Sequence, residues 1–104
     1  MIDIETLKAL CKKQAIRPTH HALLRLLQRN ITLSDVEYAL LNGEIIEQYP
    51  NDYPFPSCLV LSTADYPLHV VCSVADDEIW LVTAYRPDRT EWENDFKTRK
   101  EKKR

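Results

Sequence analysis

The chain contains a single glycine, Gly43, and the hydrophobic pattern changes at that point. Before it, apolar residues recur at spacings of three and four, which is typical of amphipathic helices. After it, Val, Leu, Ile and aromatic residues gather in short runs separated by proline and aspartate, which is typical of strands joined by turns. The division predicts an α+β fold with the helices first and the sheet second. Gly43 itself is expected to end the last of these helices in a left-handed conformation.

Cap residues mark where the helices before Gly43 should begin. Asp3 and Thr19 suit the first position of two helices, and Thr32 with Asp35 resembles a capping box. All the helices are expected to pack on one face of the sheet. Their predicted ranges are residues 3–14, 19–29 and 33–42.

The second part of the chain is expected to form a four-stranded antiparallel sheet followed by a C-terminal helix. Turns are predicted at residues 64–67 and at Asp76-Asp77, so that successive strands pair as hairpins. Trp92 and Phe96 would share the buried face of the last helix, near residues 91–99. The predicted strands cover residues 44–49, 57–63, 68–75 and 78–85.

Length and charge favour an ordinary globular protein. The 104 residues suit one domain spanning residues 1–104, with a basic tail at 97–104 that is expected to fray. The net charge of −2 hides an uneven distribution: +4 over residues 1–30, −11 over 31–95 and +5 over 96–104. Basic ends can attract phosphates, although solvated charge is the commoner reason for such runs. The acidic start and the lack of a long apolar run predict a cytoplasmic location and no membrane contact.

The cysteines and histidines do not favour a metal site or a cofactor. Cys11, Cys58 and Cys72 are odd in number and widely spaced, which argues against a disulfide framework and against structural zinc. His20 and His21 are adjacent, so on a helix they point about 100° apart and cannot share a ligand. No metal and no cofactor are therefore expected.

Two groups of residues could carry chemistry. His21, Arg25 and Arg29 are spaced by four, so they form one ridge along the predicted second helix. Arginine binds phosphate through planar, paired donors, which makes the ridge a candidate phosphate site. The alternative is the solvated polar face of an amphipathic helix.

The second group lies on the predicted sheet. By strand alternation His69 shares a face with Val71 and Ser73, and Thr83 shares one with Tyr85. A face carrying His69, Thr83 and Tyr85 would be unusually polar, with histidine as acid or base and tyrosine as a donor. The alternative is that His69 and Tyr85 are core or rim residues with satisfied hydrogen bonds.

The chain carries an ordered set of short motifs from about residue 19 to residue 99. They are Thr19-His20-His21-Ala22 with Arg25 and Arg29, Asp35-Val36, Gly43-Glu44-Ile45-Ile46-Glu47, Tyr49-Pro50, Pro56-Ser57-Cys58-Leu59, Pro67-Leu68-His69-Val70-Val71, Val82-Thr83-Ala84-Tyr85 with Pro87, and Trp92, Asp95-Phe96 and Arg99. The set resembles the bacterial family known as domain of unknown function 4258, in which the position of Asn30 is more often occupied by glycine. The resemblance implies a kinship with RelE and BrnT toxins, which are small α+β ribonucleases paired with antitoxins, some of them zinc-finger proteins of the MqsA kind.

The resemblance and the two groups together predict a toxin that acts as a metal-independent endoribonuclease on RNA, free or ribosome-bound. His21, His69 and Tyr85 are the candidate catalytic residues. Arg25, Arg29 and Arg99 are the candidate phosphate-binding residues. The alternative is a non-catalytic module that binds RNA or a protein, so catalysis itself is left open at this point.

Overall fold

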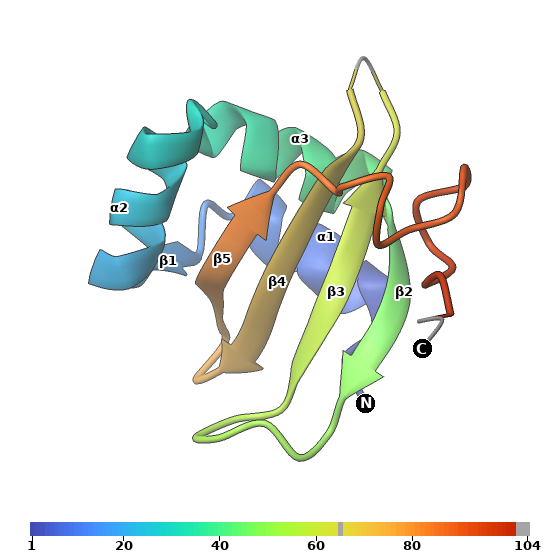
Figure 1. Cartoon of the computed structure of the whole chain (residues 1–104). Coiled ribbons are helices and arrows are strands. Elements are labelled where there is room, and N and C mark those ends of the chain that lie inside the picture. The colour runs from blue at the N-terminus through green and yellow to red at the C-terminus, as the bar shows by residue number, and fades with distance from the viewer. Residues whose placement is uncertain (65, 102–104) are drawn as a thin grey trace.

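The computed structural model describes residues 1–64 and 66–101, and it combines three helices with one five-stranded sheet (Figure 1). The strand order is β1-β5-β4-β3-β2, in which β1 is parallel to β5 and the other pairs are antiparallel. The elements are α1 (Ile4–Lys12), β1 (Ile16–Pro18), α2 (His20–Arg29), α3 (Leu33–Asn42), β2 (Glu44–Tyr49), β3 (Ser57–Ser62), β4 (Leu68–Ala75) and β5 (Glu78–Tyr85).

The predicted four-stranded antiparallel sheet is wrong because β1 adds a fifth, parallel strand. This strand has three residues, which is too short for any periodic signal, and it ends on Pro18, a residue confined to sheet edges. Backbone hydrogen bonds from Ile79 to Ala15 (2.7 Å) and from Thr19 to Leu81 (3.2 Å) extend the pairing beyond it. β1 thereby covers half of an edge that β5 would otherwise leave open.

The predicted C-terminal helix is also wrong. Residues 91–100 form an irregular hairpin, closed by a bridge between Trp92 and Arg99 and by a hydrogen bond from Glu93 N to Thr98 O (2.8 Å). The Asp95 carboxylate accepts from the backbone of Lys97 and Thr98, and such local bonds compete with helix formation. A helix this short also needs tertiary packing to persist. Residues 97–100 of the predicted tail belong to this hairpin, and residues 102–104 lie outside the described residues.

The predicted helix starts are confirmed. Asp3 accepts from the backbone of Glu5, Thr19 accepts from Ala22, and Thr32 forms the reciprocal capping box with Asp35. The second helix ends at Asn30, which is left-handed with φ 56°. The predicted turn at Asp76-Asp77 is also present, since both residues are left-handed as a two-residue hairpin requires. The other predicted turn contains Asp65, which lies outside the described residues.

Gly43 is needed for space and not for its backbone angles. Its φ of −91° and ψ of −173° are extended, so the left-handed conformation predicted for it is wrong. A Cβ atom at this position would lie 2.5 Å from the carbonyl oxygens of Ala39 and Leu61. Glycine therefore allows α3 to turn directly into β2 against the end of β3.

We expect Gly43→Ala to lower the free energy of unfolding by about 1–3 kcal/mol, as overpacking does in a tight site. The methyl group would meet two backbone oxygens, which cannot move as a side chain could. Urea unfolding measures the change. Asn30→Gly is the control, because glycine tolerates a left-handed position. Equal stability of Gly43→Ala and the parent would contradict this account of the close approach.

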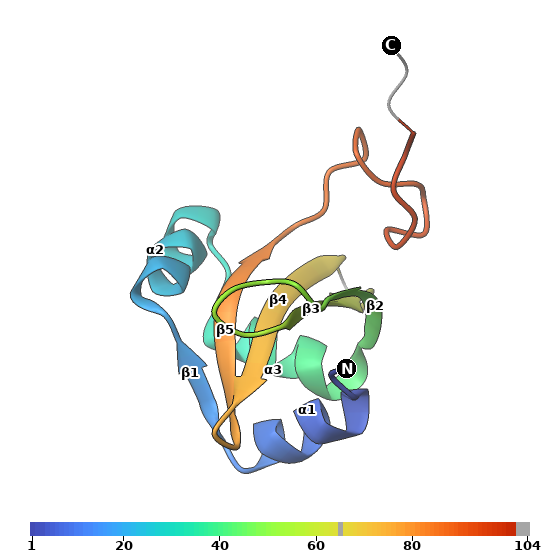
Figure 2. The same ribbon diagram turned by 90° about the horizontal axis from the view of Figure 1, so that it is seen from below.

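Two of the helices and the C-terminal segment cover opposite faces of the sheet, so the prediction that all the helices pack on one face is wrong for α2. α1 and α3 pack on one face, while α2 lies along the edge made by β1 and the end of β5 (Figures 1 and 2). α2 still contributes Ala22 and Leu26 to the common core, beside Leu7, Leu40 and Val70. Residues 87–101 pass over the other face, on the side of β2. None of the helices in the described residues is long and apolar enough to cross a membrane.

Candidate functional site

His69 and Tyr85 form a hydrogen-bonded pair on the sheet face that the C-terminal segment covers. They are direct cross-strand partners on β4 and β5, with His69 Nδ1 3.2 Å from the Tyr85 hydroxyl. The other ring nitrogen, Nε2, lies 2.7 Å from the carbonyl oxygen of Phe96. Because a carbonyl only accepts, Nε2 must donate to it. Nδ1 is then the acceptor of the neutral ring, and the Tyr85 hydroxyl donates to it.

The histidine is shut off from solvent. His69 is 0% exposed, and the ring of Trp92, itself 2% exposed, stands perpendicular to it at 4.5 Å between centroids. Burial lowers the pKa of His69, which keeps the ring neutral near pH 7. Tyr85 is only partly buried, and burial raises the pKa of its hydroxyl, so it stays protonated. Tyr85 is therefore the member of the pair that a ligand can reach.

The lowered pKa of His69 predicts how the free energy of unfolding depends on pH. The unfolded chain binds a proton near the ordinary pKa of 6.5, whereas the folded chain resists protonation at His69 until the pH is lower. The unfolded state is thus favoured as the pH falls below about 6.5. We expect the free energy of unfolding to decline from there, and this step to be absent in His69→Gln. Paired carboxylates such as Glu47 contribute only at lower pH, below their ordinary 4.5. An identical decline between pH 6.5 and 5 in both proteins would contradict the prediction.

Arg29 joins the helix ridge to the sheet. Its Nη1 donates to Thr83 Oγ1 (3.1 Å) and to the Ala84 carbonyl oxygen (2.9 Å), the two residues before Tyr85. Besides the effect of burial, the positive charges of Arg99 and Arg29 act to lower the pKa of Tyr85. Two groups of residues that are far apart in the sequence thus meet at the end of β5.

His21 and Arg25 continue the ridge away from this meeting point. Arg25 Nε donates to His21 Nε2 (3.3 Å), and its Nη1 donates to Gln28 (3.0 Å). His21 lies two helical turns from Arg29, or about 12 Å along the axis. The structure therefore brings Arg29 to the two residues before Tyr85, but leaves His21 at the far end of the exposed ridge.

Arg99 is committed to an acidic partner. Its Nε and Nη2 atoms donate to both carboxylate oxygens of Glu47 at 3.0 Å, and its guanidinium lies 4.5 Å above the ring of Trp92. Burial alone would raise the pKa of Glu47, but hydrogen bonds from Arg99 and Tyr49 lower it below the ordinary value. Arg99 thus fastens the C-terminal segment to β2, and a phosphate would have to compete with Glu47 for it.

Sequence reasoning missed the residues that enclose His69. The candidate site residues did not include Trp92, the Phe96 carbonyl or Glu47. Trp92 was predicted to lie in a helix, and Glu47 lies 52 residues from its partner Arg99. A pairing at that separation leaves no local pattern. The available signal was charge. The predicted strand at residues 44–49 is acidic and the segment after residue 96 is basic, so the two segments are expected to attract each other.

No metal or redox centre is evident among the described residues. They contain no group of three or more His, Cys, Asp or Glu side chains that could hold a metal ion. Cys58 and Cys72 face each other in the core with their sulfurs 3.9 Å apart, and Cys11 is buried elsewhere.

Comparison with known protein families gives a match. The family described as "Domain of unknown function (DUF4258)" matches residues 19–86, more than half of the chain. The matched region contains the ridge on α2 and both members of the His69–Tyr85 pair, while Trp92 and Arg99 lie beyond it. No curated protein and no solved structure matches the chain. The chain belongs to the DUF4258 family.

Proposed function

We propose that this protein is a metal-independent endoribonuclease and the toxin of a type II toxin–antitoxin pair. The observation that carries the proposal is that Arg29 binds Thr83 and Ala84, directly before the Tyr85 that is hydrogen-bonded to His69 at the end of β5. RNA cleavage without a metal needs a base for the 2′-hydroxyl and a cation for the phosphate, and this cluster offers both.

The chemistry follows from the direction of the hydrogen bonds. The 2′-hydroxyl gives its proton to the Tyr85 oxygen while the Tyr85 proton passes to His69 Nδ1. The 2′-oxygen bonds to phosphorus, the bond to the 5′-oxygen breaks, and that oxygen leaves with a proton from solvent. The products are a 2′,3′-cyclic phosphate and a 5′-hydroxyl. His69 acts through Tyr85, which explains how a fully buried histidine could serve a reaction at the surface.

Two arginines supply the positive charge in this proposal. Arg29 uses only Nη1 in the hydrogen bonds of the described residues, so Nε and Nη2 can hold the phosphate. Arg25 and His21 extend the basic ridge along α2 and would contact flanking nucleotides. Glu47 favours the imidazolium that His69 becomes, because its negative charge acts to raise the pKa of the ring.

The biological setting is part of the same proposal. We infer kinship with RelE and BrnT toxins from the ordered motifs between residues 19 and 99. A cognate antitoxin, of the zinc-finger MqsA kind, would then neutralise the protein in the cytoplasm where its RNA substrate lies. A small antitoxin-like reading frame beside the gene would support this setting.

The test uses purified protein in the presence of EDTA, with single-stranded RNA and with ribosome-bound message as substrates. We expect Arg29→Ala to lower the rate of cleavage by about 10²–10³-fold, as the loss of one donor to a developing charge does. Arg17→Ala is the matched control, because Arg17 is an exposed arginine that pairs with Glu78 near the other end of β5. Activity that requires Mg²⁺, or equal rates for the two variants, would count against the proposal.

A non-catalytic binding module is the second candidate, and the complete burial of His69 favours it. Such a module would use the ridge on α2 to hold RNA by its phosphates. Binding would then weaken with salt but show no cleavage on any substrate. Induced expression separates the two candidates in cells, because catalysis predicts growth arrest that Tyr85→Phe and Arg29→Ala both abolish.

A further inference from the structure

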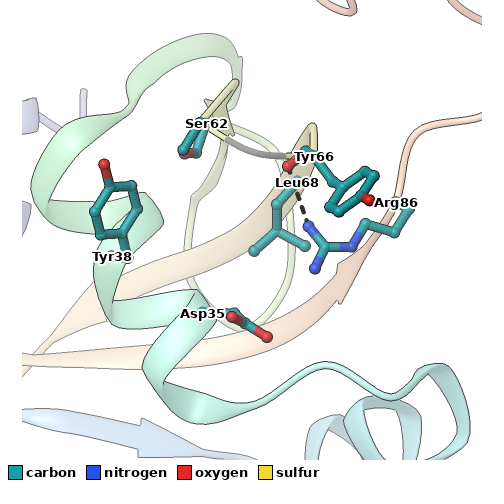
Figure 3. A pocket seen from close by; sticks show the side chains of 7 residues that line it. Asp35, Tyr38, Ser62, Tyr66, Leu68 and Arg86 are labelled. Atoms are coloured by element: carbon teal, nitrogen blue, oxygen red, sulfur yellow. Dashed lines mark hydrogen bonds between the residues drawn. The ribbon is translucent and has the colours of Figure 1, made fainter.

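A cavity of about 310 Å³ lies between α3, the turn that joins β3 to β4, and Arg86, the residue that follows β5 (Figure 3). Its volume is at the lower end of the range of ligand pockets, which suits a single small ring system. α3 provides two of the lining side chains, and the ends of β3 and β4 provide two more. The rest come from the turn between β3 and β4 and from the residue after β5. The residues that matter here are Asp35, Tyr38, Ser62, Tyr66, Leu68 and Arg86.

The cavity has an acceptor and a donor on different sides. Asp35 accepts the capping bond from Thr32 N (2.9 Å) through Oδ2, and Oδ1 takes part in no hydrogen bond within the described residues. The hydrogen bond with the Thr32 backbone lowers the pKa of Asp35, so the carboxylate is charged at neutral pH. Arg86 donates through Nη1 to the carbonyl oxygens of Tyr66 (3.2 Å) and Pro67 (3.5 Å). These bonds hold the guanidinium at the rim with Nε and Nη2 available.

Aromatic and apolar groups complete the lining. Tyr38 and Tyr66 are 52% and 74% exposed, which is high for rings of this size. Leu68 is nearly buried and lies between Tyr38 and Arg86 in the close view (Figure 3). Single-stranded RNA is recognised by bases that stack on such rings and bond through their edges. The lining therefore suits a planar heterocycle with donors on one edge and acceptors on another.

We propose that this cavity binds a guanine base of the RNA substrate, an inference that rests on the proposed function. Guanine carries the N1–H and N2–H₂ donors on one edge, which suit the carboxylate of Asp35. Its O6 and N7 acceptors suit a guanidinium, the commonest specific partner of guanine. Adenine would instead turn the lone pair of N1 toward the carboxylate. The pyrimidines lack the paired O6 and N7 acceptors.

The position of the cavity connects it to the cluster at Tyr85. Arg86 directly follows Tyr85, the last residue of β5. Arg29 ends α2 and Asp35 lies in the first turn of α3, so the short connection between these two helices joins the two places. An RNA strand that crosses the end of β5 can thus hold guanine in the cavity and a neighbouring phosphodiester at Arg29. Cleavage is then expected beside guanine.

Calorimetric titration of the full chain with guanosine and adenosine monophosphates tests the pocket. We expect the protein to bind guanosine monophosphate more tightly than adenosine monophosphate. The Asp35→Asn substitution should weaken the binding of guanosine monophosphate by at least about tenfold. Asparagine can still accept the capping bond from Thr32 through its carbonyl oxygen, so the helix start is preserved. Asp88→Asn is the matched control, because Asp88 also accepts a local backbone bond, from Thr90, but lies outside the cavity.

Two outcomes would overturn the inference: equal affinity for the two nucleotides, or an unchanged preference for guanine in a folded Asp35→Asn variant. Thermal unfolding of the variant verifies that it is folded, and Arg86→Gln repeats the test from the other side of the cavity. The pocket and the proposed ribonuclease can fail separately. Preferential binding of guanosine monophosphate without RNA cleavage would overturn only the ribonuclease. Cleavage without any preference for guanine would overturn only the pocket.

Discussion

Tyr85→Phe is expected to lower the rate of RNA cleavage by about 10²–10⁴-fold, the usual worth of a group that transfers a proton. The substitution keeps the ring and its edge-on packing against His69, at 5.2 Å between centroids. It removes the hydroxyl that hydrogen-bonds to Nδ1 of the buried His69. Initial rates under single-turnover conditions measure the effect without contributions from product release.

Tyr53→Phe is the matched control for this prediction, because Tyr53 is 95% exposed in the loop between β2 and β3 and lies away from the cluster. It should cleave at the parental rate. His69→Gln should be impaired to a similar degree as Tyr85→Phe, since the proton then has no acceptor. Comparable rates for Tyr85→Phe and Tyr53→Phe would show that the phenolic proton has no part in the reaction.

The second large effect concerns the C-terminal segment. We expect Trp92→Ala to lower the free energy of unfolding by about 3–5 kcal/mol, the cost of removing a buried aromatic side chain. Trp92 is 2% exposed and lies between the ring of His69 and the guanidinium of Arg99. Its loss would open a cavity over the sheet and admit water to His69. Urea denaturation followed by circular dichroism measures the change.

Phe96→Ala is the control for Trp92→Ala, since Phe96 is only partly buried and contacts His69 through its backbone carbonyl. Phe96→Ala should lower the free energy of unfolding clearly less than Trp92→Ala does. A Trp92→Ala protein as stable as the parent would mean that the C-terminal segment contributes little to the folded state. It would also contradict the conclusion that this segment, which lies outside the region of the family match, buries His69 in the folded protein.

Local signals in the sequence predicted local structure well. The capping residues Asp3, Thr19 and Thr32 act within three residues of the backbone groups that they satisfy, so their positions fixed the helix starts. The alternation of β4 and β5 was also readable, and it put His69 and Tyr85 on the shared face that the register confirms. These predictions needed no knowledge of distant contacts.

Contacts between distant residues were not predictable in the same way. The three residues of β1 acquire their strand conformation from β5, more than sixty positions later in the chain, and carry no periodicity. The segment around Trp92 has helical spacing but gains more from covering His69 and pairing Arg99 with Glu47. Gly43 was correctly identified as a special position, but the predicted reason, a left-handed backbone, was wrong. The actual reason is the close approach of Leu61, a tertiary contact that local sequence does not reveal. Likewise, spacing placed His21 and Arg29 on one ridge but could not say which end meets the sheet.

The most direct test of the central claim compares an RNA oligonucleotide with DNA of the same sequence, incubated with the protein in EDTA. The account predicts cleavage of the RNA alone, with products that end in a 2′,3′-cyclic phosphate, because the 2′-hydroxyl is the nucleophile whose proton passes through Tyr85 to His69. Mass spectrometry of the fragments identifies these ends. Cleavage of the DNA, or RNA fragments that carry a 5′-phosphate and a 3′-hydroxyl, would contradict it.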